Sequence, residues 1–264
     1  MIYFDNAATT WPKPEAVYKA VDYFMREQGA SPGRSGHRMA LTAGQIIAEA
    51  RNLVAKLFNA PEPSQVIFTL NTTEALNLGI KGLLKPGDHV ITSSLEHNSV
   101  VRPLETLLNL GIEVTKLPTS VSSGLLGRQV DEAIKENTKL IILTHASNVT
   151  GVLNPIHEIG KIARARGVLF MVDSAQTAGA FPIDVQKMCI DMLAFAGHKG
   201  LLGPQGVGGL WIRNDLQLAP LKEGGTGSHS ESPLQPEKCP DRHESGTFNT
   251  PGIAGLVAGL RDNS

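Results

Sequence analysis

Residues 139–175 read KLIILTHASNVTGVLNPIHEIGKIARARGVLFMVDSA and contain a strand–helix–strand pattern. The runs at 139–147 and 168–175 are short, apolar and β-rich, and the segment 156–167 between them has apolar residues at helical spacing. Two strands joined through a helix lie parallel in one sheet. The stretch therefore predicts an α/β fold with a mostly parallel sheet and helices on both faces.

The same alternation continues along most of the chain. Further β-rich runs are 65–70, 89–94, 113–118, 191–197 and 207–212, and further helical patterns are 15–29, 41–58, 73–84 and 98–111. We expect a long loop at 223–241 and an apolar helix beginning near residue 250. Ligands of such sheets bind beyond the carboxyl ends of the strands. Polar residues follow five predicted strands, as NTTE (71–74), EHN (96–98), SN (147–148), DSAQ (173–176) and HK (198–199).

Composition narrows the class of protein. The chain has 264 residues, of which 41% are hydrophobic, with 24 basic and 25 acidic residues. This near-neutral balance gives no reason to expect nucleic acid or a membrane surface as a partner. The N-terminus has no signal-peptide pattern, and no apolar run is long enough to span a bilayer. Two cysteines are too few for a disulfide scaffold, so we expect a cytoplasmic protein.

Two of the strand-end residues point to carbonyl chemistry. Lys199 stands where an apolar run, IDMLAFAG (190–197), passes into a glycine-rich stretch. A buried lysine loses its charge readily and can then form a Schiff base with a carbonyl. Taken alone, it also fits a lysine that extends from a strand end to solvent. Asp173 could keep a pyridinium nitrogen protonated, or it could simply cap a helix.

Two further patterns lie at the same edge. The segment NTTEALN (71–77) places hydroxyls and backbone N–H groups at a helix start, which suits a phosphate or a plain helix cap. His97 could lie over an aromatic cofactor or move protons, and it could equally be a polar surface residue. Each pattern has a structural explanation by itself. Their shared edge favours one common site.

Taken together, the motifs of the chain resemble those of a known family. The motifs YFDNAATT, TTEALN, EHNS, SNVTG, VDSAQTAG, GHKGLLGPQGVGGL and RHESGTFN follow the order typical of class V aminotransferase-like enzymes. Over nearly all its length the chain is similar to the large domain of a cysteine desulfurase or selenocysteine lyase. The resemblance implies fold type I of pyridoxal-phosphate-dependent transferases, a three-layer α/β/α architecture. It also implies an N-terminal active-site segment (1–14), a cofactor-binding large domain (15–264), and a small C-terminal domain absent from this chain.

The resemblance also implies an activity and a cofactor, pyridoxal 5'-phosphate. The substrate would be L-cysteine, which is converted to L-alanine while its sulfur is retained as an enzyme-bound persulfide, or L-selenocysteine, the substrate of a selenocysteine lyase. Partners would be a second copy of the chain in a homodimer and, after the reaction, a sulfur-acceptor protein.

Five residues would surround the cofactor ring, by resemblance. Lys199 would form the Schiff base and return as a proton shuttle. Asp173 would pair with the pyridine nitrogen, Gln176 would contact the phenolic oxygen, and Asn148 would lie near that edge. His97 would stack on the ring and relay protons.

The phosphate would be held by a second group. Thr72, Thr73 and His198 would contact it within one subunit, and Thr226 would reach it from the neighbouring subunit. Relatives usually carry a hydroxyl two positions before the His-Lys pair, where this chain has Ala196. A hydrogen bond to a charged group is worth about 1.5–3 kcal/mol, so its loss should weaken cofactor binding without abolishing it.

The family's sulfur-accepting cysteine and substrate-binding arginine lie in the C-terminal domain, beyond this chain. We expect Cys189 to be a small core residue. Cys239 lies in the long loop and could approach the site, although catalytic use is not the favoured interpretation.

Two other functions remain open from the sequence. The same scaffold could carry another reaction, such as transamination, or epimerase- or kynureninase-like chemistry. The chain could also bind the cofactor without turnover. A nucleotide-binding α/β protein is disfavoured, because NTTEALN lacks the Gly-Lys-Ser/Thr ending of a P-loop and no GxGxxG opens the first helix.

Overall fold

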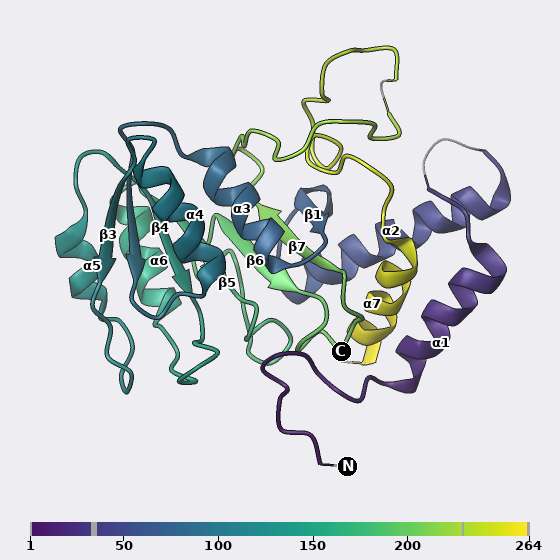
Figure 1. The fold of residues 1–264 in the computed structure, drawn as a ribbon, viewed down its shortest axis with the longest axis horizontal. Coiled ribbons are helices and arrows are strands. Elements are labelled where there is room, and N and C mark those ends of the chain that lie inside the picture. The colour runs from purple at the N-terminus through teal and green to yellow at the C-terminus, as the bar shows by residue number, and fades with distance from the viewer. Residues whose placement is uncertain (1, 33–35, 229, 263–264) are drawn as a thin grey trace.

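The computed structural model describes residues 2–32, 36–228 and 230–262. In this part of the chain, seven strands form one sheet in the order β1-β7-β6-β5-β4-β2-β3, with helices packed against it (Figure 1). The strands are β1 (Val66–Thr69), β2 (His89–Ser93), β3 (Glu113–Leu117), β4 (Thr138–Thr144), β5 (Leu169–Asp173), β6 (Met192–Ala196) and β7 (Gly208–Ile212). The predicted α/β fold with a mostly parallel sheet is confirmed.

Strand direction decides which residues share an edge. Strands β2, β3, β4, β5 and β6 all run parallel to one another. Strand β7 is antiparallel to both β6 and β1, so β1 points the same way as β6. The carboxyl ends of β1, β2, β4, β5 and β6 therefore lie at one edge of the sheet. The polar segments that follow these strands are brought to that edge together.

Helices cover both faces. They are α1 (Glu15–Tyr23), α2 (Arg38–Leu57), α3 (Thr72–Leu83), α4 (Asn98–Leu108), α5 (Gly127–Ala133), α6 (Ile156–Ala165) and α7 (Thr250–Asp262), with a π-helical turn η1 (Phe24–Gln28) and a 3-10 turn η2 (Pro63–Gln65). Within the described ranges, no helix combines the length and apolar character that crossing a membrane requires.

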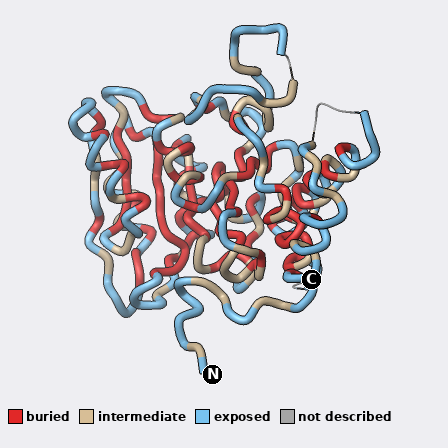
Figure 2. Tube along the Cα trace, turned by 45° about the vertical axis from the view of Figure 1, so that its right-hand side comes forward, coloured by how far each residue is buried: buried red, intermediate tan, exposed pale blue. Residues whose placement is uncertain are grey.

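The two faces of the sheet belong to two apolar clusters. In β4, Ile141 and Leu143 pack with residues of α2, α5, α6 and α7, whereas Leu140 and Ile142 pack with residues of α3 and α4. A strand buried on both faces has a continuous apolar run, here residues 140–143, which is why β4 was a clear sequence signal. Figure 2 shows the strands as the most continuously buried part of the chain and the N-terminal segment as largely exposed.

The structure differs from the sequence prediction in one helix. Helix α5 was not expected, because it is seven residues long and buries only Gly127 and Val130, too few positions to establish a helical period. The loop expected at 223–241 is confirmed as part of a longer connection between β7 and α7, in which the described residues form neither helix nor strand. That connection projects from the body of the molecule in Figure 1.

Candidate functional site

A cavity with about 520 Å³ of empty space lies at the carboxyl edge of the sheet. Its walls come from the starts of α3 and α4, the ends of β4 and β5, and the turn after β6. It is lined by Asn71, Thr72, Thr73, Leu76, His97, Ser99, Thr144, Ala146, Asn148, Asp173, Ala175, Gln176, His198 and Lys199. Every residue assigned to the site from the sequence lines this cavity, with the exception of Thr226.

Lys199 enters the cavity from a tight turn after β6. The turn packs so closely that a Cβ atom on Gly200 would lie 2.4 Å from the carbonyl oxygen of Ala178. Lys199 is half-buried as a result. Burial lowers the pKa of its amine, and the neighbouring Asp173 carboxylate partly offsets that effect. The amine is therefore neutralised more easily than an exposed lysine and becomes a better nucleophile.

Asp173 is the last residue of β5 and is only 3% exposed. Its carboxylate accepts a hydrogen bond from the Ala175 N–H at 2.9 Å. Burial raises the pKa of the carboxyl group, while this hydrogen bond and the positive charges of His97 and Lys199 lower it. Residues 175–180 form turns, so the helix-cap interpretation is wrong. A cationic group facing this enclosed carboxylate would stabilise its charged form.

The start of α3 supplies an unsatisfied hydroxyl. Asn71 caps the helix, because its Oδ1 accepts from the Glu74 N–H at 2.9 Å. The hydroxyl of Thr73 pairs with the Ser99 hydroxyl at 2.7 Å. The buried hydroxyl of Thr72, in contrast, has no hydrogen-bond partner among the described residues. A buried polar atom of this kind is costly unless a ligand satisfies it, and a helix N-terminus favours an anion.

The start of α4 carries a second polar cluster. His97 caps the helix, with its Nδ1 accepting from the Ser99 N–H at 3.1 Å. Beside it, the carboxyl group of Glu96 accepts from the Ser93 hydroxyl at 2.6 Å and from the Thr144 N–H at 2.8 Å. Its carboxyl end is enclosed although the residue as a whole keeps intermediate exposure, and this burial raises the pKa of Glu96 to about 8. Sequence reasoning gave Glu96 no role.

The N-terminal segment passes below the sheet in Figure 1 and holds the backbone of the turn after β6. The Thr10 N–H donates to the His198 carbonyl at 3.2 Å, and the Thr10 hydroxyl donates to the Lys199 carbonyl at 2.9 Å. Lys13 Nζ also donates to the His198 carbonyl. The Thr9 hydroxyl lies 3.2 Å from the same carbonyl oxygen and 3.0 Å from His198 Nδ1.

The same segment contacts a third cavity residue, since Gln176 Nε2 donates to the Ala7 carbonyl at 3.0 Å. Burial lowers the pKa of Lys13 to about 8. Burial and the charges of Lys199 and Lys13 lower the pKa of His198. Sequence reasoning missed the individual roles of Thr9 and Lys13. The sequence indicated only that both belong to the first fourteen residues. No local pattern predicts a contact between residues 185 positions apart.

Four residues singled out from the sequence lie away from the cavity. Thr226 is in the loop after β7, where its hydroxyl lies 3.2 Å from that of Ser228. Cys239 is half-buried against the apolar cluster on the α3 and α4 face, and this burial raises the pKa of its thiol. Cys189 was expected in the core, and that is wrong: it is partly exposed in a turn with a φ of 54°. Ala196 is buried at the end of β6, outside the cavity lining.

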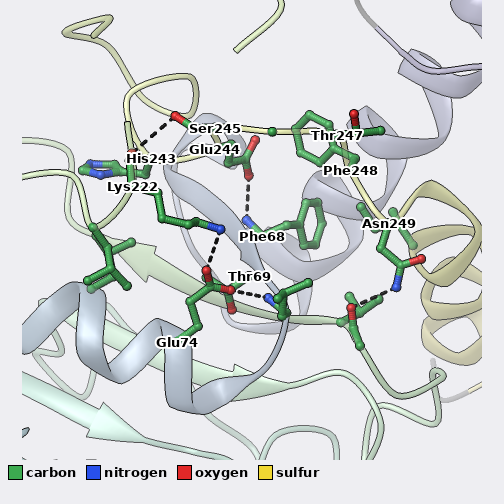
Figure 3. A pocket seen from close by; sticks show the side chains of 17 residues that line it. Phe68, Thr69, Glu74, Lys222, His243, Glu244, Ser245, Thr247, Phe248 and Asn249 are labelled. Carbon is green, nitrogen blue, oxygen red and sulfur yellow. Dashed lines mark hydrogen bonds and ion pairs between the residues drawn. The ribbon is translucent and has the colours of Figure 1, made fainter. Parts of the chain in front are cut away.

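A second hollow, with about 600 Å³ of empty space, lies between the end of β1, α3 and the segment 243–249 (Figure 3). Glu244 accepts from the outward N–H of Phe68 at 2.6 Å and forms a buried ion pair with Arg51. Lys222 reaches across to Glu74, with 2.6 Å between its Nζ and the carboxylate oxygen. These groups satisfy one another and cover the free edge of β1. We therefore assign this hollow a structural role.

Comparison with known proteins agrees with the geometry of the cavity. The family model for Aminotransferase class-V matches residues 2–262. A probable cysteine desulfurase of Methanothermobacter thermautotrophicus is 36% identical over 98% of this chain and 66% of its own length. The apo structure of a cysteine desulfurase from Thermococcus onnurineus NA1 superposes with a TM-score of 0.92 at 35% identity, covering 99% of this chain and 67% of that one.

A structure described as SspA in complex with cysteine superposes with a TM-score of 0.87 at 34% identity, covering 99% of this chain and 72% of that one. The chain thus spans about two thirds of the length of the proteins it resembles.

Proposed function

The chain belongs to the aminotransferase class-V family, and from this premise we propose that it is the cofactor-binding part of a cysteine desulfurase. Enzymes of this family depend on pyridoxal phosphate. The observation that carries the proposal is the convergence in one cavity of the half-buried Lys199 amine, the enclosed Asp173 carboxylate and the Thr72 hydroxyl, which no described residue pairs with. These three groups match an aldehyde, a ring nitrogen and a phosphate.

The donor set fits the cofactor at its two ends. Thr72, Thr73 and His198 would hold the phosphate at the start of α3, where the helix dipole favours an anion. Asp173 would keep the ring nitrogen protonated. The positive charge of that nitrogen would in turn offset the cost of burying the Asp173 carboxylate. When bound, the cofactor supplies an electron sink that stabilises negative charge on the substrate Cα.

The remaining polar residues would orient the substrate and move its protons. Lys199 would accept the Cα proton and return it later, because burial lowers the pKa of its amine. His97 would lie against the ring face, with its Nδ1 already oriented by Ser99. Gln176 and Asn148 would border the phenolic edge of the ring.

The substrate would be L-cysteine or L-selenocysteine. With L-cysteine as the substrate, a thiolate would attack the substrate sulfur and the C–S bond would break. Its electron pair stays with the carbon skeleton, which takes up a proton and leaves as alanine. The sulfur remains as a persulfide for transfer to an acceptor protein. Neither Cys189 nor Cys239 lines the cavity, so we assign neither as that thiolate.

We also propose a homodimer in which Thr226 of one copy reaches the phosphate of the other. Thr226 lies outside the cavity of its own chain, which supports that arrangement. Residues 1–14 would act as an active-site segment, supported by the contacts of Thr10 and Lys13, and residues 15–264 as the large domain. The free cysteines support a reducing, cytoplasmic compartment.

The decisive test is a visible absorption spectrum of the purified chain after addition of pyridoxal phosphate, before and after borohydride. We expect an absorption band that borohydride abolishes, and a reduced adduct that peptide mapping places on Lys199. The Lys199→Ala variant should show no such adduct. An adduct that persists in this variant would overturn the assignment.

The reaction itself is tested by adding L-cysteine or L-alanine to the loaded protein together with a dithiol. Alanine released from cysteine, with sulfide in equal amount, supports desulfuration. Conversion of added L-alanine to pyruvate, with transfer of the amino group to the cofactor, would instead assign transamination.

A further inference from the structure

Three donors converge on one backbone carbonyl next to the candidate nucleophile. Lys13 Nζ, the Thr10 N–H and the Thr9 hydroxyl all lie within hydrogen-bond distance of the His198 oxygen. The Thr9 hydroxyl also lies 3.0 Å from His198 Nδ1. A hydroxyl carries one proton, so Thr9 can donate either to the carbonyl oxygen or to the ring nitrogen.

The other two donors decide between these alternatives. A carbonyl oxygen has two lone pairs, and an ammonium group or a backbone N–H can only donate. Lys13 and Thr10 therefore occupy both acceptor positions of the His198 carbonyl, and the bond from Lys13 is charge-assisted. The proton of Thr9 is left for His198 Nδ1, which must then be unprotonated.

The state of Nδ1 determines whether Nε2, on the other side of the His198 ring, carries a proton. Burial and two neighbouring ammonium groups lower the pKa of His198, which favours the neutral form of its ring. A neutral imidazole that accepts at Nδ1 carries its proton on Nε2. Among the described residues Nε2 has no hydrogen-bond partner, and His198 lines the same cavity as Thr72 and Thr73.

We propose that Thr9 and Lys13 are positioning residues that hold His198 in its Nε2–H tautomer, so that the ring offers a donor to an anionic group bound at the start of α3. The opposite tautomer would direct a lone pair at that anion and repel it. The tautomer assignment stands on the contacts of the chain itself. The identity of the anion as a phosphate rests on the proposed function.

The test is ¹⁵N NMR of the cofactor-free 264-residue chain labelled at histidine, with the His198 signals assigned through a His198→Gln variant. In the wild type we expect the proton on Nε2 and a bare Nδ1. Lys13→Met frees one lone pair of the His198 carbonyl, so the Thr9 hydroxyl can turn to it and accept from Nδ1–H instead. We expect the tautomer ratio to shift about tenfold toward Nδ1–H, which is what one hydrogen bond is worth.

Two matched variants separate this effect from a general disturbance. Lys13→Arg keeps a cationic donor and should retain the wild-type tautomer. In a Thr9→Val background, Lys13→Met should no longer alter the ratio, because the hydroxyl that responds has gone. The inference is overturned by an Nδ1–H ring in the wild type. It is also overturned if Lys13→Met leaves the tautomer unchanged while Thr9 is present.

A second readout is the dissociation constant for pyridoxal phosphate, measured by absorbance. We expect Lys13→Met to bind it more weakly in proportion to the Nε2–H fraction that the variant loses, and Lys13→Arg to bind it like the wild type. Equal affinity despite a shifted tautomer would overturn the role of the ring in anion binding. Failure of the wild type to bind pyridoxal phosphate, with the tautomers as expected, would contradict the proposed function and leave the tautomer assignment standing.

Discussion

Replacing Glu96 by glutamine should flatten the pH dependence of stability. The carboxyl group is enclosed between the ends of β2 and β4, where it accepts hydrogen bonds from Ser93 and Thr144. Burial and the nearby negative charge of Asp173 raise its pKa from an ordinary value of 4.5 to about 8, against the lowering effect of those hydrogen bonds and of Lys116. Glutamine imitates the protonated carboxyl group in shape and charge but does not titrate.

The sign and size of the effect follow from proton linkage. Between the two pKa values the native state holds a proton that the unfolded chain releases, so the free energy of unfolding falls as the pH rises and the fall ends above about pH 8. At about 1.36 kcal/mol per pH unit, Glu96 alone should remove about 2.5 kcal/mol between pH 5 and pH 7. Asp173, whose pKa is also raised, adds a slope of the same sign in both proteins.

The assay is urea denaturation of the cofactor-free chain followed by circular dichroism at pH 5, 6, 7 and 8. The difference in unfolding free energy between Glu96→Gln and the wild type should grow by about 2.5 kcal/mol from pH 5 to pH 7 in favour of the variant. Exposed Glu105 on α4 provides the matched control, since Glu105→Gln should follow the wild-type curve. Parallel curves for Glu96→Gln and the wild type would refute the reasoning.

Three further substitutions test separate parts of the structure. Thr72→Val should weaken pyridoxal phosphate binding about tenfold in an absorbance titration without lowering the unfolding free energy, because it removes a buried hydroxyl that has no partner in the described part of the chain. Glu244→Ala leaves Arg51 buried without its counter-charge and should cost about 3–5 kcal/mol in urea denaturation; a loss below about 1 kcal/mol would contradict this. Gly160→Ala would place a Cβ atom 1.9 Å from the Met188 carbonyl oxygen, so α6 must shift; we expect a loss of about 1–3 kcal/mol and a lower Tm, whereas an unchanged Tm would show that the helix is not held there.

Much of the candidate site was accessible from the sequence because it sits at strand ends. Strands β4, β5 and β6 are apolar at nearly every position, and polar residues begin where each one stops. In a parallel sheet those stops fall on one edge, so Asp173 and Lys199 could be placed together without coordinates. The antiparallel strand β7 does not change this result, because β1, on its far side, runs in the same direction as β6.

The residues that tune the site were not accessible in this way. Thr9 and Lys13 belong to a segment with neither helix nor strand, and no periodicity links them to His198. In the sequence, Glu96 is an ordinary acidic residue before a helix. Only its enclosure between β2 and β4 raises the pKa of its carboxyl group. Cys189 was misjudged because its apolar neighbours suggested burial, whereas a left-handed turn leaves it partly exposed.

The sequence alone determined the layered α/β architecture and the edge at which the candidate site lies, because hydrophobic periodicity and strand ends are local properties of the chain. Tertiary structure decided how those groups behave. It left the Thr72 hydroxyl without a partner among the residues that the structure describes, enclosed the carboxyl groups of Asp173 and Glu96, and set the N-terminal segment against the His198 carbonyl. Burial and hydrogen-bond partners depend on residues far apart in the chain, and no local pattern specifies them.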